Sequence, residues 1–479
     1  MKKKLIGKRV LGVLLAAVLT VGMTACGPRG SETGKDSNKD GAESGKIGKT
    51  DDTIVDLEGY EFTIGSHFLQ DDPDMDAITG AERSFEEARR QVEEAYNCKI
   101  TIVPFSSDIE SVRARAMSGD KIADVLDYPI NDLLQSIRAG YVQSLDNLEG
   151  IYTDDYRWVK GYTNIAKYDG VSYGVNMMRP AEVRTCLIYN RQMLKEYGIE
   201  ENIEQLVKNN EWTFDKFAEI AKKCTKDTNG DGIIDTYGLY TYGASTLGIS
   251  MINANGGSLV EVQDGVAKES YNSQKCINAL NALSKWVNED KFVANVYKDK
   301  ADLGVTTSEY AKYFVKEECA FLFCESWLVN QNVKKIAGDL DYGMLPLPMG
   351  PDAEDYISTA FNGRVFAIPT TNTENIDKTV IVLNALGKAV AGDESDGEEW
   401  WEYDVEVDYF QKGDTASVEM YKLLLDKCYV DLGTGVSGLL SEFGQKCIVN
   451  PCFKSVGTPA AQIEAMTGKY QSVIDGVYN

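Results

Sequence analysis

The sequence predicts an α/β protein with two lobes. Two observations support this fold class: the chain has 479 residues, and short apolar strands alternate along it with amphipathic helices. A chain of this length usually forms more than one hydrophobic core. Strands that alternate with helices build sheets from βαβ units, in which neighbouring strands run parallel. Because no internal repeat of fixed period is visible, a repeat architecture is not expected.

The first run of alternating elements follows residue 59. Strands are predicted at 60–65, 99–105 and 123–127, where apolar and β-branched residues gather. Helices are predicted at 81–96 and 109–117, where apolar residues recur at helical spacing with charged residues between them. These segments supply a first sheet with its covering helices.

The same alternation returns in the second half of the chain. Strands are predicted at 185–189, 319–323 and 365–368, and a helix is predicted at 214–223. Ligands of open α/β sheets bind beyond the carboxyl ends of the strands. That rule selects the polar and aromatic residues that follow predicted strands, which are His67, Asp127, Tyr128, Tyr242, Glu325 and Trp327.

The start of the chain is expected to be a targeting signal followed by a flexible tether. Residues 1–25 carry lysine and arginine and then sixteen apolar or small residues, fewer than the ~20 that cross a bilayer as a helix, as in a secretory signal. The residues before Cys26 are Met23-Thr24-Ala25, and they resemble a bacterial lipobox, although Leu with Ala or Ser is usual at the first two positions. The resemblance implies a lipidated Cys26. Residues 26–52 are polar and predict a flexible tether.

Charge and cysteine content exclude several classes of function. The formal net charge is −25, which disfavours binding to nucleic acid or to anionic membrane surfaces and suits a protein that works outside a cell. Nine cysteines remain beside Cys26, an odd number that argues against a fully paired disulfide scaffold. With one histidine and no repeated CxxC pair, no zinc framework is visible. The pairing of Cys319 with Cys324 and of Cys447 with Cys452 stays open.

Several segments together resemble a known family. The sequence Tyr-Asp-Gly-Val-Ser-Tyr-Gly-Val at 168–175 is similar to a crossover motif, and Trp-Thr-Phe-Asp-Lys-Phe at 212–217 to a helix start, in the extracellular solute-binding proteins of bacterial ABC importers. This family includes maltose- and alginate-oligosaccharide-binding proteins. Further similar segments lie at 123–127, 139–145, 186–191, 321–327, 366–369 and 373–375.

The resemblance implies a two-lobe, periplasmic-binding-protein-like (type II) fold that closes over its ligand like a hinge. Crossings are expected near 175–180, 325–330 and 383–390. Lobe 1 is expected to contain 53–176 and 328–388, and lobe 2 to contain 177–327 and 389–479.

The implied function is the capture of a carbohydrate, as an oligosaccharide, for an ABC importer permease. The protein is then a monomeric, non-enzymatic lipoprotein on the extracytoplasmic face of the cell membrane. The alternatives are a receptor for another solute such as a peptide, a surface glycan-binding adhesin, or a glycan-degrading enzyme. The acidic run at 398–402 invites the enzyme interpretation, but adjacent acids more often form a solvated face. No nucleophile elbow, Walker loop or zinc-protease motif supports another reaction.

Sugar binding needs aromatic faces for C–H groups, and carboxylates, amides or guanidinium groups for hydroxyls. Trp327 is the predicted platform, with packing at the hinge as its alternative, and Tyr128 and Tyr242 are predicted to stack. Asp127 and Glu325 are predicted contacts because an acid at the end of an apolar strand is costly unless it is paired or faces a cleft. The remaining candidates are His67, in a polar loop, and the hydrogen-bonding pair Asn362 and Arg364.

A calcium-like loop lies outside these candidates. Asp227, Asn229, Asp231 and Asp235, with the carbonyl of Ile233, occupy the first, third, fifth, ninth and seventh positions of a calcium-binding loop. The glutamate expected at the twelfth position is absent. The sequence therefore predicts either a structural Ca²⁺ site or a metal-free turn rich in Asp and Asn.

Overall fold

A computed structural model describes residues 52–478, except 76–77, 79, 180–182, 264–265, 299–306, 362, 393–400 and 437. The predicted signal segment, Cys26, nearly all of the tether and Asn362 therefore lie outside the described residues. By its internal contacts the chain divides into Met1–Glu43 and Ser44–Asn479, and the description below concerns the second unit. Within the described residues, no helix combines the length and apolar character needed to cross a membrane.

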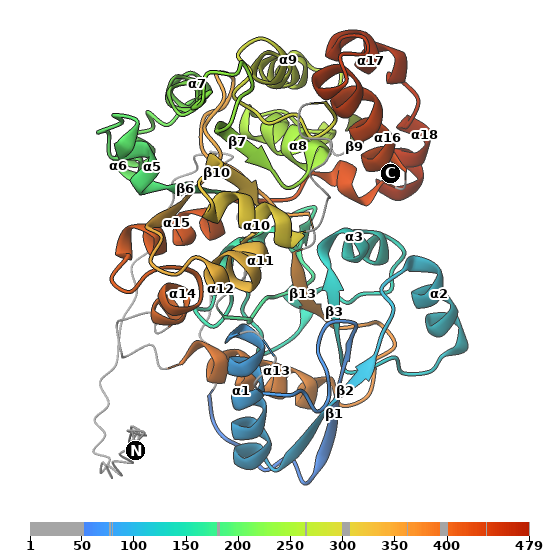
Figure 1. Cartoon of the computed structure of the whole chain (residues 1–479). Coiled ribbons are helices and arrows are strands. Elements are labelled where there is room, and N and C mark those ends of the chain that lie inside the picture. The colour runs from blue at the N-terminus through green and yellow to red at the C-terminus, as the bar shows by residue number, and fades with distance from the viewer. Residues whose placement is uncertain are drawn as a thin grey trace, which may run out of the picture. The chain divides into compact units, whose positions relative to one another are not determined.

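The first sheet has four strands in the order β13-β3-β1-β2 (Figure 1). β1 runs parallel to β2 and β3, whereas β13 runs antiparallel to β3. α1 and α13 pack against each other and against this sheet, and α3 packs on β3 and on α2. The bounds are β1 Tyr60–Ser66, α1 Gly80–Tyr96, β2 Cys98–Pro104, α2 Ile109–Ser118, β3 Val125–Pro129, α3 Ile130–Arg138, β13 Arg364–Ala367 and α13 Ile376–Ala391.

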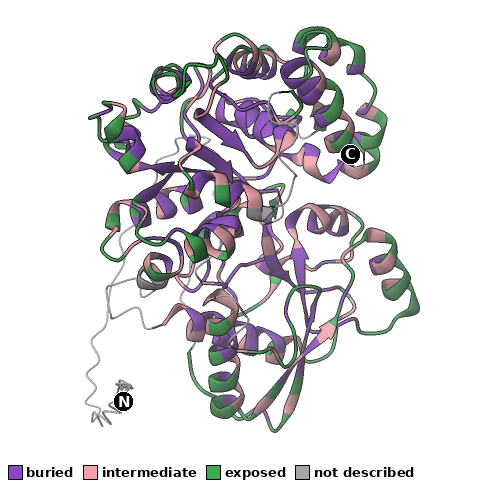
Figure 2. Cartoon of the chain, in the orientation of Figure 1, coloured by how far each residue is buried: buried purple, intermediate pink, exposed green. Residues whose placement is uncertain are grey.

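The second sheet also has four strands, in the order β11-β6-β10-β7. β10 is parallel to β7, and β6 is antiparallel to both β10 and β11. All four strands are buried along their whole length (Figure 2), so helices or loops cover both faces of this sheet. The bounds are β6 Cys186–Asn190, β7 Tyr237–Thr241, β10 Cys319–Cys324 and β11 Tyr342–Leu345.

Helix α7 shows how the local sequence builds this layer. It spans Phe214–Lys223, and the hydroxyl of Thr213 accepts the N–H of Lys216 at its start. Phe217 and Ile220 recur at helical spacing on its buried face, which packs on β7. The capping residue and the apolar stripe together explain why the helix forms here.

The remaining helices and short strands lie between and after the strands of the two sheets. Those before β10 are η1 Leu145–Asn147, α4 Lys160–Ile165, β4 Lys167–Tyr168, β5 Val171–Ser172, α5 Arg191–Glu196, α6 Ile203–Lys208, α8 Ala244–Ala254, β8 Val260–Gln263, β9 Val266–Glu269, α9 Gln274–Asn288 and α10 Thr307–Val315. Those after it are α11 Ser326–Leu328, η2 Val329–Val333, α12 Lys334–Ile336, β12 Ser358–Thr359, α14 Trp401–Tyr409, α15 Thr415–Asp426, β14 Cys428–Tyr429, η4 Leu432–Gly435, α16 Leu439–Phe443, η5 Gly444–Phe453, α17 Pro459–Met466 and α18 Gln471–Tyr478.

Two sequence expectations need correction. The sheets are mixed rather than purely parallel, because β13 and β6 run opposite to their neighbours. In addition, β11 pairs with β6 of the second sheet, although residues 328–388 were assigned to the first lobe. The chain therefore returns to the first sheet after β11, and β13 is the strand that joins it there.

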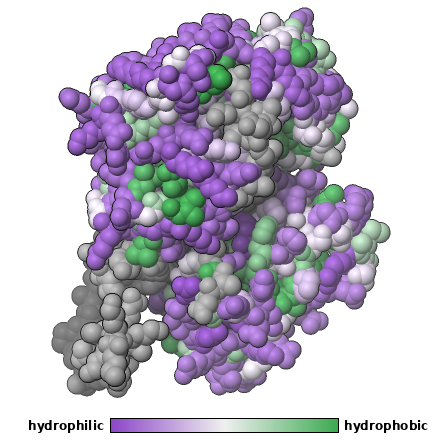
Figure 3. Space-filling model, in the orientation of Figure 1, coloured by the Kyte–Doolittle hydropathy of each residue, from purple (hydrophilic) through white to green (hydrophobic). Residues whose placement is uncertain are grey.

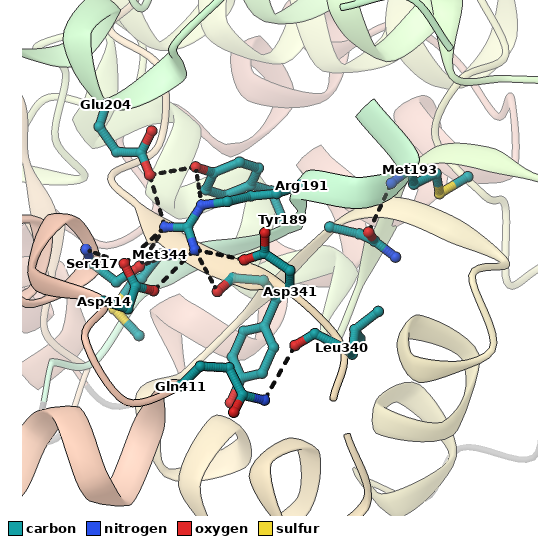
Figure 4. A network of polar contacts seen from close by, with 12 residues as sticks. Tyr189, Arg191, Met193, Glu204, Leu340, Asp341, Met344, Gln411, Asp414 and Ser417 are labelled. Atoms are coloured by element: carbon teal, nitrogen blue, oxygen red, sulfur yellow. Dashed lines mark hydrogen bonds and ion pairs between the residues drawn. The ribbon is translucent and has the colours of Figure 1, made fainter. Parts of the chain in front are cut away.

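The C-terminal segment is fastened to the second sheet through Arg191 (Figure 4). The guanidinium group donates to both oxygens of Asp414, at 3.0 and 3.1 Å, and to Glu204 at 2.8 Å. It also bonds Ser417 of α15, which packs on β11. Residues 389–479, which were expected in the second lobe, thus contribute α15, and α15 packs on β11 of the second sheet.

The cysteines other than Cys26 are all described, and none of them is bridged. Seven of these nine residues are buried and two are half-buried. Most of them are therefore small apolar residues of the core, and neither of the two open pairings is formed.

Candidate functional site

Polar and aromatic side chains gather at the carboxyl ends of strands in both sheets. The first-sheet cluster consists of Ser66, His67, Phe68, Asp127 and Arg364. The second-sheet cluster consists of Arg184, Tyr242, Tyr310, Glu325 and Trp327. The two clusters contain six of the eight residues predicted from the sequence and four that were not predicted. Of the other two predicted residues, Tyr128 lies outside the clusters and Asn362 is not described.

 The six predicted members are His67, Asp127, Tyr242, Glu325, Trp327 and Arg364.

Strand direction explains why the first-sheet cluster forms. β1 and β3 are parallel, so Ser66 and Asp127 lie toward the same edge of the sheet. β13 runs antiparallel to β3, and Arg364 at its start pairs with Pro129 at the end of β3. Arg364 is therefore brought to this edge although it is the first residue of its own strand and not the last.

The carboxylate of Asp127 is fully engaged within the first-sheet cluster. It accepts the Ser66 hydroxyl at 2.7 Å and the Nε of Arg364 at 3.1 Å, and it also bonds the Nη2 of Arg364. Asp127 itself is 1% exposed. The guanidinium group of Arg364 lies 4.3 Å from the centre of the Phe68 ring, and Phe68 is 37% exposed. Asp127 thus orients Arg364, while Phe68 offers an accessible ring.

Tyr128 does not belong to either cluster, and its predicted stacking role is corrected. The side chain is 0% exposed and packs edge-on against Phe105 at a centroid distance of 5.2 Å. Successive side chains of a strand point to opposite faces, so Asp127 and Tyr128 could not both face the same site. Burial also raises the pKa of the Tyr128 hydroxyl.

The second-sheet cluster is built around Trp327 and Tyr242. The Trp327 ring lies 5.7 Å from that of Tyr242 at an interplanar angle of 88°, and Tyr242 meets Tyr310 edge-on at 6.0 Å. The indole N–H of Trp327 donates to Glu325 at 2.6 Å. Trp327 and Tyr242 are half-buried, so both keep part of their rings accessible.

Glu325 links the aromatic rings to a cation. Its carboxylate lies 3.7 Å from the guanidinium group of Arg184, which comes just before β6. Burial, together with the charge of Glu325, raises the pKa of the Tyr242 hydroxyl. Each cluster therefore pairs one carboxylate with one arginine beside exposed aromatic surface.

Sequence reasoning missed Ser66, Phe68, Arg184 and Tyr310. Phe68 follows β1 directly after His67, so the rule that selected His67 could have included it. Arg184 precedes a strand, and Tyr310 lies in α10, far along the chain from its aromatic partner Tyr242. No local pattern distinguishes those two residues.

The predicted calcium loop is closed by its own hydrogen bonds. Both carboxylate oxygens of Asp227 accept backbone N–H groups, of Gly230 at 2.7 Å and of Gly232 at 2.8 Å. Asp235 accepts the N–H of Thr228 at 2.7 Å. Among the described residues, no group of three or more His, Cys, Asp or Glu side chains is arranged to hold a metal ion. This arrangement is that of a turn rich in Asp and Asn, and the calcium site stays a prediction.

The chain is similar in fold to several solved structures. The cyclo/maltodextrin-binding protein complexed with maltotetraose aligns at a TM-score of 0.59 and 14% identity, over 87% of this chain and 98% of that one. The GacH receptor of Streptomyces glaucescens, solved unliganded and with acarbose, gives 0.57 and 14% over the same shares of the two chains. UgpB from Mycobacterium tuberculosis, in complex with glycerophosphocholine, also gives 0.57 and 14% over these shares. These similarities show that the two-lobe fold is shared.

Sequence comparison identifies the family. A search among curated proteins found no significant match. The model of one family, however, matches residues 78–381, which is more than half of the chain and includes the whole second-sheet cluster together with Asp127 and Arg364 of the first-sheet cluster. The chain therefore belongs to the bacterial extracellular solute-binding proteins.

Proposed function

We propose that this protein captures a saccharide between its two lobes and delivers it to an ABC importer permease. The observation that carries the proposal is the pair of clusters at the strand ends of the two sheets, in a chain that belongs to the extracellular solute-binding proteins. Each cluster combines accessible aromatic rings with fixed hydrogen-bonding groups, which is the chemistry that sugar rings require.

The charges in the clusters favour a neutral ligand. Asp127 is matched by Arg364, and Glu325 is matched by Arg184, so neither cluster carries a net charge from these groups. A charged ligand would need a counter-charge that these pairs already use. A neutral saccharide needs only donors, acceptors and ring faces. Two of the similar solved structures hold maltotetraose or acarbose, in agreement with this choice.

The binding step is expected to be capture without chemical change. One lobe holds the ligand first, and the second closes on it, because a ligand stabilises the closed form only through contacts made there. The proposal also places the protein at the extracytoplasmic face of the membrane, held by a lipid on Cys26, where the permease is the partner.

The test is a thermal-shift screen of the purified protein against neutral oligosaccharides, short peptides and glycerophosphocholine. A ligand that binds only the folded state adds about 2.7 kcal/mol of stability at a hundredfold excess over its dissociation constant. A rise in Tm with one class of oligosaccharide, without any change of the sugar on prolonged incubation, supports the proposal. A rise only with peptides or with glycerophosphocholine refutes the carbohydrate assignment, and turnover of the sugar refutes the transport role.

A further inference from the structure

A cavity of about 240 Å³ lies apart from both clusters and shares no residue with them. Its walls are largely aromatic and aliphatic, and polar side chains stand at its mouth. Six of its lining residues are Leu134, Asn164, Tyr168, Asp169, Tyr429 and Tyr478. Asn164 and Asp169 are exposed, so the cavity is reached from solvent through a polar rim.

One wall of the cavity comes from the lobe of the first sheet. Leu134 lies in α3, the helix that follows β3 and packs on it. Asn164 lies in α4, which contacts β13 of the same sheet, and Tyr168 lies in the β4–β5 hairpin that follows α4.

The opposite wall comes from the second lobe. Tyr429 ends β14, and the buried carboxylate of Asp431 just after it accepts the N–H of Leu259 at 2.7 Å. Leu259 follows α8, the helix after β7 of the second sheet. Tyr478 lies in α18, which packs on β9 and touches α3 (Figure 1). The two lobes thus meet around the cavity.

Hydrogen bonds hold the aromatic walls in place. The hydroxyl of Tyr168 donates to the carbonyl of Tyr478 at 3.0 Å, which joins the two lobes. The hydroxyl of Tyr478 donates to the carbonyl of Leu432 at 2.6 Å. With both hydroxyls engaged, the two rings are fixed and present apolar surface to the cavity, which is a preformed rather than an induced arrangement.

The size and lining of the cavity select its ligand. A volume of about 240 Å³ is below the ~300–1,000 Å³ of sites for drug-sized ligands, so it suits one ring rather than an oligosaccharide. Aromatic walls suit the C–H face of a sugar ring, and the amide of Asn164 and the carboxylate of Asp169 suit hydroxyl groups at the mouth. Lys167, another exposed lining residue, offsets the charge of Asp169, so no net charge is demanded of the ligand.

We propose that this cavity is a second binding site, which takes a single neutral sugar ring. Because both lobes supply its walls, an occupant binds only the lobe arrangement that forms the cavity, and it shifts the population toward that arrangement. Occupancy then changes the affinity of the clusters for the transported saccharide, by the same factor in both directions. This coupling, unlike the binding itself, rests on the proposed function.

The test measures monosaccharide binding by calorimetry in the whole protein and in matched variants. The probes are D-glucose, D-galactose, D-mannose and D-xylose, up to about 20 mM, since a site of this size is expected to bind in the millimolar range. Asn164→Trp places a large ring at the mouth and is expected to abolish binding. Asn209→Trp, at an exposed asparagine at the end of α6, is the control and keeps binding. Trp327→Ala, which alters the second-sheet cluster, also keeps it.

Saturable binding that only Asn164→Trp abolishes supports the proposal. Binding that Asn164→Trp leaves unchanged, or that Trp327→Ala abolishes, places the sugar elsewhere and overturns it, as does no binding of any of the four probes. The coupling predicts that a saturating monosaccharide changes oligosaccharide affinity by about fivefold or more, and that Asn164→Trp removes this effect. If no oligosaccharide binds while the monosaccharide does, the proposed function fails and the second site stands.

Discussion

Replacing Arg191 with methionine tests how the C-terminal segment is held to the second lobe. Methionine keeps much of the length of the side chain but removes the guanidinium group, which bonds Glu204, Asp341 and Asp414. The side chains of Glu204 and Asp414 are only 10% and 9% exposed, whereas Asp341 is 61% exposed. The substitution therefore leaves two nearly buried carboxylates without their cation.

The expected loss of stability follows from this difference in exposure. Removing one partner of a buried ion pair costs about 3–5 kcal/mol, whereas an exposed pair contributes only about 0–1 kcal/mol. An unfolding entropy of about 2.1 cal/mol/K per residue, over roughly 430 residues, makes each kcal/mol worth about 1 °C. Arg191→Met is therefore expected to lower Tm by about 3–5 °C if the protein unfolds as one unit.

Differential scanning calorimetry at neutral pH is the assay, with two comparison variants. Asp341→Asn removes only the exposed partner and is expected to leave Tm within about 1 °C. Arg191→Lys keeps the charge but not the bidentate geometry, so it is expected to fall between Arg191→Met and the unchanged protein. A Tm for Arg191→Met equal to that of Asp341→Asn would show that the ion pairs of Arg191 do not stabilise the attachment of the C-terminal segment to the second lobe.

Four further predictions concern binding, pH, metal and anchoring. Trp327→Ala is expected to weaken saccharide binding about tenfold or more by calorimetry with little change in Tm, and unchanged affinity would remove Trp327 from the site. Burial would raise the pKa of Asp124, but hydrogen bonds, above all from Lys121, outweigh it and lower that pKa. Its contribution to stability is therefore complete above about pH 4 and is lost as pH falls through the lowered pKa, so Asp124→Asn is expected to reduce the acid-induced loss of Tm. If the loop holds calcium, Ca²⁺ raises the Tm of the unchanged protein but not of Asp231→Asn, and equal Tm with Ca²⁺ and with chelator means a metal-free turn. Cys26→Ala is expected to release the protein from the membrane fraction, and retention there would refute the anchor.

Much of the fold was predictable because its elements carry strong local signals. The strand at 60–65 and the helix at 81–96 were predicted within one residue of β1 and α1. The direction of β13 and the pairing of β11 were not predictable, because they depend on where the chain crosses between lobes. Periodicity describes a segment and its buried face, but it does not identify the partner strand.

The candidate site, too, was predictable in part: some of its residues carry a local sequence signal and others do not. Glu325 and Trp327 were selected by their place after a strand, and the structure adds that one bonds the other. The same rule selected Tyr128, where the alternation of side chains along the strand directs the ring into the core. Arg184 and Tyr310 reach the cluster through tertiary contacts, which the sequence pattern does not contain.

The contacts inside each cluster have a consequence for closure. Asp127 already holds Arg364, and Glu325 already holds Trp327, so neither cluster needs a ligand to keep its shape. Each therefore binds with little cost of reorganisation, and the free energy that favours the closed form must come from a ligand that touches both clusters at once. A saccharide long enough to reach from one cluster to the other is then expected to close the protein, whereas one that reaches a single cluster binds more weakly and leaves it open. The shortest oligosaccharide that reduces the radius of gyration in solution scattering would measure that span, and closure by a monosaccharide at the clusters alone would contradict this mechanism.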